Sequence, residues 1–304
     1  MLHEIFYWLF NMSITAAITG LLIMLIRSIR VIPRRLTVIL WAVPFLRMVV
    51  PIGLNSPYSF MTLLSKFATK TVVVYEPVED FVLSMTNSVL AADTYFPITY
   101  KVNVLETVFH VFAIVWIVVF LAILLTLTVV YFSTLRGMKD AVYLHNNIYV
   151  SERIVSPTVY GIIKPKIVFP ASLDGTNAEL IVQHEKIHMR RKDNLWRILA
   201  IAITAIHWYN PLCWIFLKLF LADLELSCDE HVLAAVGRER AKEYAQTLLE
   251  YRQHADMFSS SFGGAKIRRR ITNILSFRKL TWFSLTAFIP LIVAIFYTLL
   301  TNAG

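Results

Sequence analysis

The chain has 304 residues, of which 57% are hydrophobic and only 16% are charged, and its formal net charge is +9. Soluble domains carry about a quarter of charged residues, so this composition, with a mean hydropathy of +0.62, excludes an ordinary soluble protein and indicates a membrane protein. Two cysteines, Cys213 and Cys228, exclude a disulfide-based exported fold. The basic residues are not interleaved with aromatic residues, so we expect no direct contact with nucleic acid.

Three segments are apolar over about the 20 residues that a helix needs to cross a bilayer: roughly 5–26, 104–134 and 281–300. The first lacks a basic start and a small-residue cleavage site, so we expect a retained span rather than a cleaved signal peptide. A fourth segment, 36–54, is shorter and contains two prolines and Arg47. We predict that it also spans the membrane, with Arg47 facing protein or water rather than lipid.

The distribution of charge predicts the orientation. The turn 27–35 carries four arginines and no acid, and region 135–280 holds 21 Lys and Arg against 14 Asp and Glu, whereas loop 54–103 is slightly acidic. Positively charged loops remain in the cytosol, which places 27–35 and 135–280 inside the cell, and 54–103 and both chain ends outside.

We therefore predict an α-helical integral membrane protein. It has four transmembrane helices, with a cytosolic α+β domain inserted between the third and the fourth. The predicted parts are 1–53 (two spans and the basic turn), 54–103 (extracellular loop), 104–134 (third span), 135–280 (cytosolic domain) and 281–304 (last span and short extracellular end).

Two segments early in the cytosolic domain, 147–151 and 163–169, are rich in strand-forming residues and are punctuated by prolines and a glycine. One interpretation is a sheet whose edge binds an extended peptide substrate as an additional strand. The other is a small hairpin that only covers the core. Composition does not separate the two.

The stretch His184-Glu185-Lys186-Ile187-His188 matches the H-E-x-x-H pattern of zinc peptidases. Residues four apart lie on one face of a helix, so both imidazoles can reach one ion. Glu185 can then act as general base toward a water molecule at that ion. The preceding residues contain no Gly or Pro, and Thr176 or Asn177 can cap the predicted helix.

A catalytic zinc site needs a third protein ligand, and a polar cluster at 223–231 offers one. Glu225 is the best candidate. Asp229 lies one helical turn further on, where it can accept the second N–H of a liganding histidine. Cys228 and His231 are rival ligands, because thiolate and imidazole also bind zinc.

The apolar stretch 195–222 separates these two parts of the site. A single membrane crossing would place His184 and Glu225 on opposite sides, and the stretch is too short for two crossings. Asn210-Pro211 interrupts it near the middle. We predict a bent helical pair that leans into the bilayer or packs against the spans, which holds the zinc site near the inner membrane surface.

The segment 225–230, following the motif at 184–188, resembles the BlaR/MecR antirepressor family of integral-membrane zinc metallopeptidases. Segments 156–170 and 191–193 resemble the same family, and the resemblance covers roughly residues 1–300. It implies a gluzincin-like zinc peptidase domain and a multi-pass location in the bacterial cytoplasmic membrane.

The resemblance also implies roles for particular residues. In the family, the two histidines of H-E-x-x-H and the glutamate of the later segment bind zinc, which here are His184, His188 and Glu225. The catalytic base would be Glu185. The resemblance favours Glu225 over Cys228 as the third ligand.

The basic segment 266–270 precedes the last span and is typical of a membrane anchor. Members of the family also cleave themselves between the peptidase domain and the last span, which implies a linker at 266–280, with Gly263-Gly264 adding flexibility. The candidate self-cleavage residues are Arg268, Arg269, Arg270, Ser276 and Phe277.

The resemblance implies an endopeptidase that relays an extracellular antibiotic or cell-wall signal, with a role in β-lactam resistance, by cleaving a cytosolic winged-helix repressor. Sensors of the family carry a penicillin-binding domain after the last span. The sequence ends at Gly304, before such a domain would begin, so the resemblance does not imply direct β-lactam sensing by this chain. Further candidate partners are a separate extracellular sensor, a second copy of this chain and the lipid bilayer. The alternative function is a quality-control or peptide-processing zinc protease without a dedicated repressor.

Overall fold

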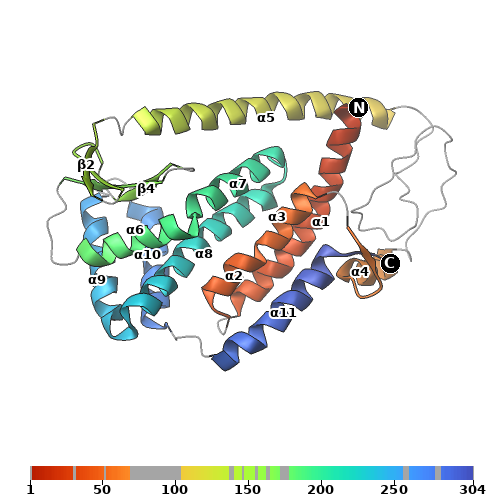
Figure 1. The fold of residues 1–304 in the computed structure, drawn as a ribbon. Helices are drawn as coiled ribbons and strands as arrows, with labels where there is room; N and C mark the ends of the chain where they lie inside the picture. The colour runs from red at the N-terminus through yellow and green to blue at the C-terminus, as the bar shows by residue number, and fades with distance from the viewer. Residues whose placement is uncertain are drawn as a thin grey trace.

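A computed structural model gives the fold, which consists mainly of helices with one small mixed sheet (Figure 1). The structure describes residues 2–29, 32–50, 53–68, 104–136, 140–145, 147–154, 157–161, 165–171, 178–255, 260–277 and 282–303. The helices are α1 (Leu2–Ser28), α2 (Arg34–Leu40), α3 (Ala42–Val49), α4 (Phe60–Ala68), α5 (Val104–Arg136), α6 (Ala178–Arg191), α7 (Asp193–Ile206), α8 (Pro211–Val236), the 3-10 turn η2 (Arg238–Arg240), α9 (Ala241–Ala255), α10 (Ser260–Leu275) and α11 (Trp282–Leu300). The strands are β1 (Asn55–Ser56), β2 (Val142–His145), β3 (Ile148–Ser151), β4 (Thr158–Tyr160), β5 (Lys166–Pro170) and β6 (Asn302–Ala303).

Helices α1 and α5 are the two in the described part of the chain that are long and apolar enough to cross a bilayer. Helix α5 runs apart from the other helices for much of its length (Figure 1), and large side chains such as Phe112 and Leu125 are exposed along it. Contiguous apolar surface of this kind is unfavourable in water, so α5 suits a lipid environment. Helix α11 is also apolar, and its stretch Thr286–Leu300 is shorter than a full span.

The segment 36–54, predicted as one span, is not one continuous helix. It forms α2 and α3, which are interrupted at Trp41, and each is too short to cross a bilayer alone. Arg47 is only 2% exposed, and its guanidinium donates to the carbonyl oxygens of Leu299 and Thr301 at the end of α11. The expectation that Arg47 faces protein rather than lipid is confirmed.

The apolar stretch 195–222 forms two helices, α7 and the first part of α8, with the predicted break at Asn210-Pro211. The Asn210 side chain accepts a hydrogen bond from the backbone N–H of Leu212 and so caps α8. At the other side of the turn, the Trp116 indole donates to the carbonyl oxygen of Ile206 over 2.8 Å. These bonds satisfy backbone groups that would otherwise be costly to place in an apolar environment.

Helix α8 contributes to two separate hydrophobic cores. Phe216 and Phe220, in its first half, pack with α1, α2, α3, α7 and α11. Val232 and Leu233, near its end, pack with the sheet, α6, α9 and α10. The polar residues between these two groups therefore lie where the helical bundle meets the domain that contains the sheet (Figure 1).

The sheet has the strand order β2-β3-β5-β4, in which the central pair β3 and β5 is parallel and both outer pairs are antiparallel. The strands predicted at 147–151 and 163–169 correspond to β3 and β5 within the described residues. Ile167 and Phe169 of β5 are buried against α6, so the sheet covers the helix that carries the H-E-x-x-H motif.

The segment predicted as a linker, 266–280, is helical as far as Leu275, and Gly263-Gly264 lie within the same helix, α10. The expectation of a flexible tether is wrong here. Ile267, Ile271 and Ile274 recur at helical spacing and pack into the second core, so apolar burial holds this segment against the domain.

The start of the predicted outer loop and the C-terminal end of the described chain lie together. Strand β1 pairs in parallel with β6, with Asn55 opposite Asn302, and α4 lies beside the C-terminus (Figure 1). This arrangement agrees with the prediction that loop 54–103 and the C-terminal end share one side of the membrane. Most of that loop lies outside the described residues.

Gly20 of α1 allows close packing of α1 on α8, because an added Cβ would overlap the Phe216 ring. We expect Gly20→Ala to lower the thermal unfolding temperature of the detergent-solubilised protein, because overpacking of this kind lowers the free energy of unfolding by about 1–3 kcal/mol. Combining it with Phe216→Leu should recover part of this loss. Leu21→Met, at an exposed position of the same helix, is the control and should unfold like the wild type.

Candidate metal centre and active site

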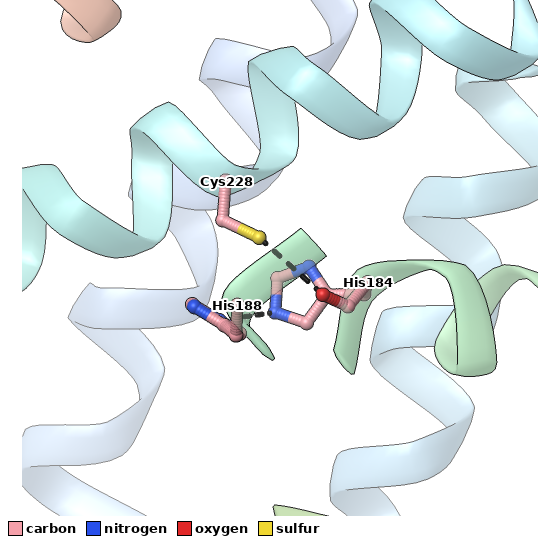
Figure 2. Close-up of side chains that lie close together, drawn as sticks. All are labelled: His184, His188 and Cys228. Carbon is pink, nitrogen blue, oxygen red and sulfur yellow. Dashed lines mark hydrogen bonds between the residues drawn. The ribbon is translucent and has the colours of Figure 1, made fainter. Parts of the chain in front are cut away.

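His184 and His188 extend from one face of α6, as the motif predicts (Figure 2). Each is 5% exposed. Their Nε2 atoms are 3.0 Å apart and the rings are perpendicular. Two nitrogens at this separation can bind one zinc ion at about 2.0–2.1 Å each. The predicted capping residues, Thr176 and Asn177, lie outside the described residues.

Glu225 of α8 completes the group. One carboxylate oxygen lies 3.7 Å from Nε2 of His184 and the other 3.6 Å from Nε2 of His188. Ligands of one tetrahedral ion are about this far apart, so the structure brings together the three residues that the sequence pattern indicates as ligands.

Of the two rival ligands, Cys228 remains close and His231 does not. The ligand atoms of His184, His188 and Cys228 lie within 4.8 Å of one another. However, the Cys228 thiol donates to the carbonyl oxygen of His184 over 3.6 Å (Figure 2). The Nδ1 atom of His231 is 2.7 Å from the carbonyl oxygen of Ser227, so that ring bonds to its own helix.

The Nδ1 atom of each histidine is hydrogen-bonded to a buried acid, either directly or through a hydroxyl group. Nδ1 of His188 is 2.6 Å from the carboxylate of Asp193. Lys192 adopts a φ of 56°, in the left-handed region, and this turn brings Asp193 back beside His188. A carboxylate at Nδ1 keeps the proton there and leaves Nε2 free to bind a metal.

The prediction that Asp229 accepts a hydrogen bond directly from His184 is wrong. Its nearer oxygen is 3.6 Å from Nδ1 of His184, and the hydroxyl of Tyr244 lies between the two. That hydroxyl is 2.8 Å from Nδ1 and donates to Asp229 over 2.7 Å. Asp229 therefore acts on His184 through Tyr244, because α9 places a buried tyrosine between the two side chains.

Two arginines flank the carboxylate of Glu225. Arg197 of α7 donates to one oxygen over 2.5 Å, and Nη1 of Arg270 lies 3.6 Å from the other. Burial opposes ionisation of Glu225, but His188, His184 and Arg270 outweigh it and hold the pKa of this carboxyl well below its usual range. Glu225 is therefore ionised, as a carboxylate must be to bind zinc.

Glu185, the predicted base, is 9% exposed. Burial raises its pKa above the usual glutamate value, although the nearby His184 and His188 partly oppose this effect. A carboxyl group with a raised pKa is a better proton acceptor near neutral pH, as general-base catalysis requires.

Four residues that the sequence reasoning missed contact the site: Asp193, Arg197, Tyr244 and Arg270. Asp193 carries a signal, since it is an acid shortly after the second histidine. The others come from different helices, and no spacing in the sequence connects them to the motif.

The edge strand β4 is tied to the site by Asn194 of α7. Its side-chain amide donates to the carbonyl oxygen of Val159 over 2.6 Å and lies 3.4 Å from that of Gly161. The edge therefore lies close to the helices that carry the site.

The candidate self-cleavage residues do not form one exposed segment. Arg268 and Arg269 are exposed on α10, and Ser276 is exposed just after it. Arg270 bonds to Asp229, and Phe277 is buried. A peptidase needs an extended substrate, so cleavage here would require α10 to unwind locally.

Comparison with known proteins identifies the family of this chain. The family model described as BlaR1 peptidase M56 matches residues 7–274. A regulatory protein BlaR1 of Bacillus licheniformis is 28% identical over 160 residues, which are 48% of this chain and 26% of that protein. A methicillin resistance mecR1 protein of Staphylococcus aureus is 29% identical over 110 residues, 35% of this chain and 19% of that protein.

The matched region thus spans about a quarter or less of the length of these relatives. The family match covers most of the chain and includes both histidines, Glu185 and Glu225. The chain belongs to the BlaR1 peptidase M56 family of metallopeptidases.

Proposed function

We propose that this chain is a membrane-embedded zinc endopeptidase that relays an extracellular antibiotic or cell-wall signal by cleaving a cytosolic transcriptional repressor. The observation that carries the proposal is the convergence of Nε2 of His184 and Nε2 of His188 on the carboxylate of Glu225. Two imidazoles and one carboxylate leave one coordination position open, which is typical of catalytic rather than structural zinc sites.

The donor set suits zinc, which accepts nitrogen and carboxylate ligands in tetrahedral geometry. When bound, the ion would polarise a peptide carbonyl and lower the pKa of water. Asp193 and Tyr244 orient the two imidazoles, and Arg197 orients Glu225. Glu185 takes a proton from the attacking water and returns it to the leaving amine nitrogen.

The edge of β4 suits an extended substrate. Main-chain pairing along a sheet edge gives affinity with little dependence on sequence, and side-chain pockets give selectivity. The Asn194 bonds to Val159 and Gly161 keep this edge near the site. These bonds also occupy the two carbonyl oxygens, so they do not separate a substrate-binding edge from a small hairpin that only covers the core.

The proposed cytosolic location is supported by the contact between the basic turn and α8. The backbone N–H groups of Arg34 and Arg35 donate to Glu230, which lies on the same helix as Glu225. The site is therefore at the same end of the molecule as the turn 27–35, which the positive-inside rule assigns to the cytosol.

The names of the relatives, a regulatory protein and a methicillin resistance protein, favour a signalling role over general processing. A winged-helix repressor is the proposed substrate, and a second copy of this chain or a separate extracellular sensor are proposed partners. The alternative, a quality-control protease, predicts cleavage of many unfolded membrane proteins. Incubation with a purified candidate repressor and with an unfolded membrane protein separates the two.

We expect Glu185→Gln to retain zinc and the fold while abolishing cleavage, because glutamine has nearly the same shape but cannot accept the proton. Elemental analysis and a cleavage assay on the same preparation check this. Glu179→Gln, at an exposed position of α6, is the matched control and should cleave normally. Cleavage by Glu185→Gln at the wild-type rate would refute the assignment of the base.

We expect Glu225→Ala to lower zinc occupancy strongly and Cys228→Ser to leave it close to wild type, because each carboxylate oxygen of Glu225 lies within 4 Å of an Nε2 atom, whereas the Cys228 thiol donates to the carbonyl oxygen of His184. Asp229→Asn should fall between them, since loss of a supporting group costs about 10–100-fold in affinity or activity. Titration with a competing chelator measures all three. Loss of the metal in Cys228→Ser alone would identify the thiol as the third ligand.

We also expect slow self-cleavage within 266–280 in wild type and none in Glu185→Gln. The segment is tethered beside the site, so its local concentration there could reach about millimolar, but α10 must first unwind. Intact-mass measurement of both proteins decides this. Equal, uncleaved masses under conditions in which another substrate is cut would leave 266–270 as a membrane anchor only.

A further inference from the structure

We infer that Arg270 of α10 is a positioning residue of the metal centre, which acts on His184 through Asp229 and Tyr244. The inference rests on the proposed metallopeptidase function. It assigns a role to a helix that carries neither the H-E-x-x-H motif nor Glu225.

Arg270 holds Asp229 with two hydrogen bonds. Its Nε donates to one carboxylate oxygen over 2.9 Å and its Nη2 donates to the other over 2.7 Å. Asp229 is fully buried, so its charge needs a partner. A forked guanidinium fixes the plane of a carboxylate, which a single ammonium group cannot do.

The orientation of Asp229 determines the next two bonds. Because the Tyr244 hydroxyl donates to Asp229, its oxygen is left to accept from Nδ1–H of His184. The proton then resides on Nδ1, and the lone pair of Nε2 points toward His188 and Glu225. Arg270 thus stands at the outer end of a hydrogen-bonded chain that sets the tautomer and the angle of one metal ligand.

Packing fixes the position of Arg270. Ile274 is fully buried and Phe277 is 5% exposed in the core that also contains Tyr244. The Asn273 side chain contacts the carbonyl oxygen of Leu226 on α8. A shift of α10 would therefore change the bonds to His184.

If Arg270 acted only through its charge, its removal would change the metal affinity in the opposite direction. Its Nη2 lies 3.4 Å from Nε2 of His184 and its Nη1 lies 3.6 Å from Glu225, and a positive charge there repels a cation. Removing the charge would then tighten metal binding. Arg270→Lys separates the two roles, because it keeps the charge and removes the fork.

The test measures zinc affinity of the detergent-solubilised chain by chelator competition, together with kcat and KM for peptide cleavage. We expect Arg270→Lys to weaken zinc binding by about tenfold. Arg268→Lys, at an exposed position of the same helix, is the matched control and should bind as wild type. Tyr244→Phe should also weaken binding, and Arg270→Lys added to Tyr244→Phe should cost less than about twofold more, because the chain is already interrupted.

Wild-type affinity in folded Arg270→Lys, or a full tenfold loss that persists in the Tyr244→Phe background, would overturn the inference. If Arg270→Lys does not fold, the double variant Arg270→Gln/Asp229→Asn avoids an unpaired buried charge. It should bind zinc as weakly as Asp229→Asn alone, and affinity equal to wild type would overturn the inference. A wild-type chain that binds no zinc would refute the proposed function as well, whereas normal wild-type binding with an unaffected Arg270→Lys would refute only the role of Arg270.

Discussion

The structure depends on the return of the chain from α6 to α8, which brings Glu225 within 4 Å of both histidines. Two apolar helices joined by a tight turn make this return, and the turn is possible because side chains from α1 and α5 bond to its polar groups. Helix α8 then continues without interruption from the bundle into the domain that contains the sheet. One rigid helix therefore carries both the packing of the bundle and a metal ligand.

Buried charges fix the other contacts of α8. Asp223 is fully buried and accepts from Arg27 over 2.6 Å and from the Trp41 indole over 2.9 Å. Glu230 accepts the first N–H groups of α2, where a negative charge also interacts favourably with the helix dipole. Breaking such a pair costs about 3–5 kcal/mol, because the remaining charge stays buried. These contacts tie the basic turn to the helix that holds Glu225.

The candidate site is assembled from five helices. Helix α6 supplies both imidazoles and the candidate base, and α8 supplies the carboxylate. Helix α7 supplies Asp193 and Arg197, and α9 and α10 supply the supporting Tyr244 and Arg270. At the opposite end of α11, Arg47 holds the last carbonyl groups of that helix.

The sequence by itself determined the membrane class, the helix with His184 and His188 and the break before α8, because each depends on local spacing or on an apolar length. It also indicated Glu225 as the candidate third ligand. The sequence did not predict that most of the proposed linker belongs to helix α10. It also did not predict which residues bond to Asp229. Only the tertiary structure decided that Tyr244 lies between Asp229 and His184 and that Arg270 closes the chain of bonds. Those contacts join helices far apart in the sequence, and their geometry depends on how the second core packs rather than on any spacing within one helix.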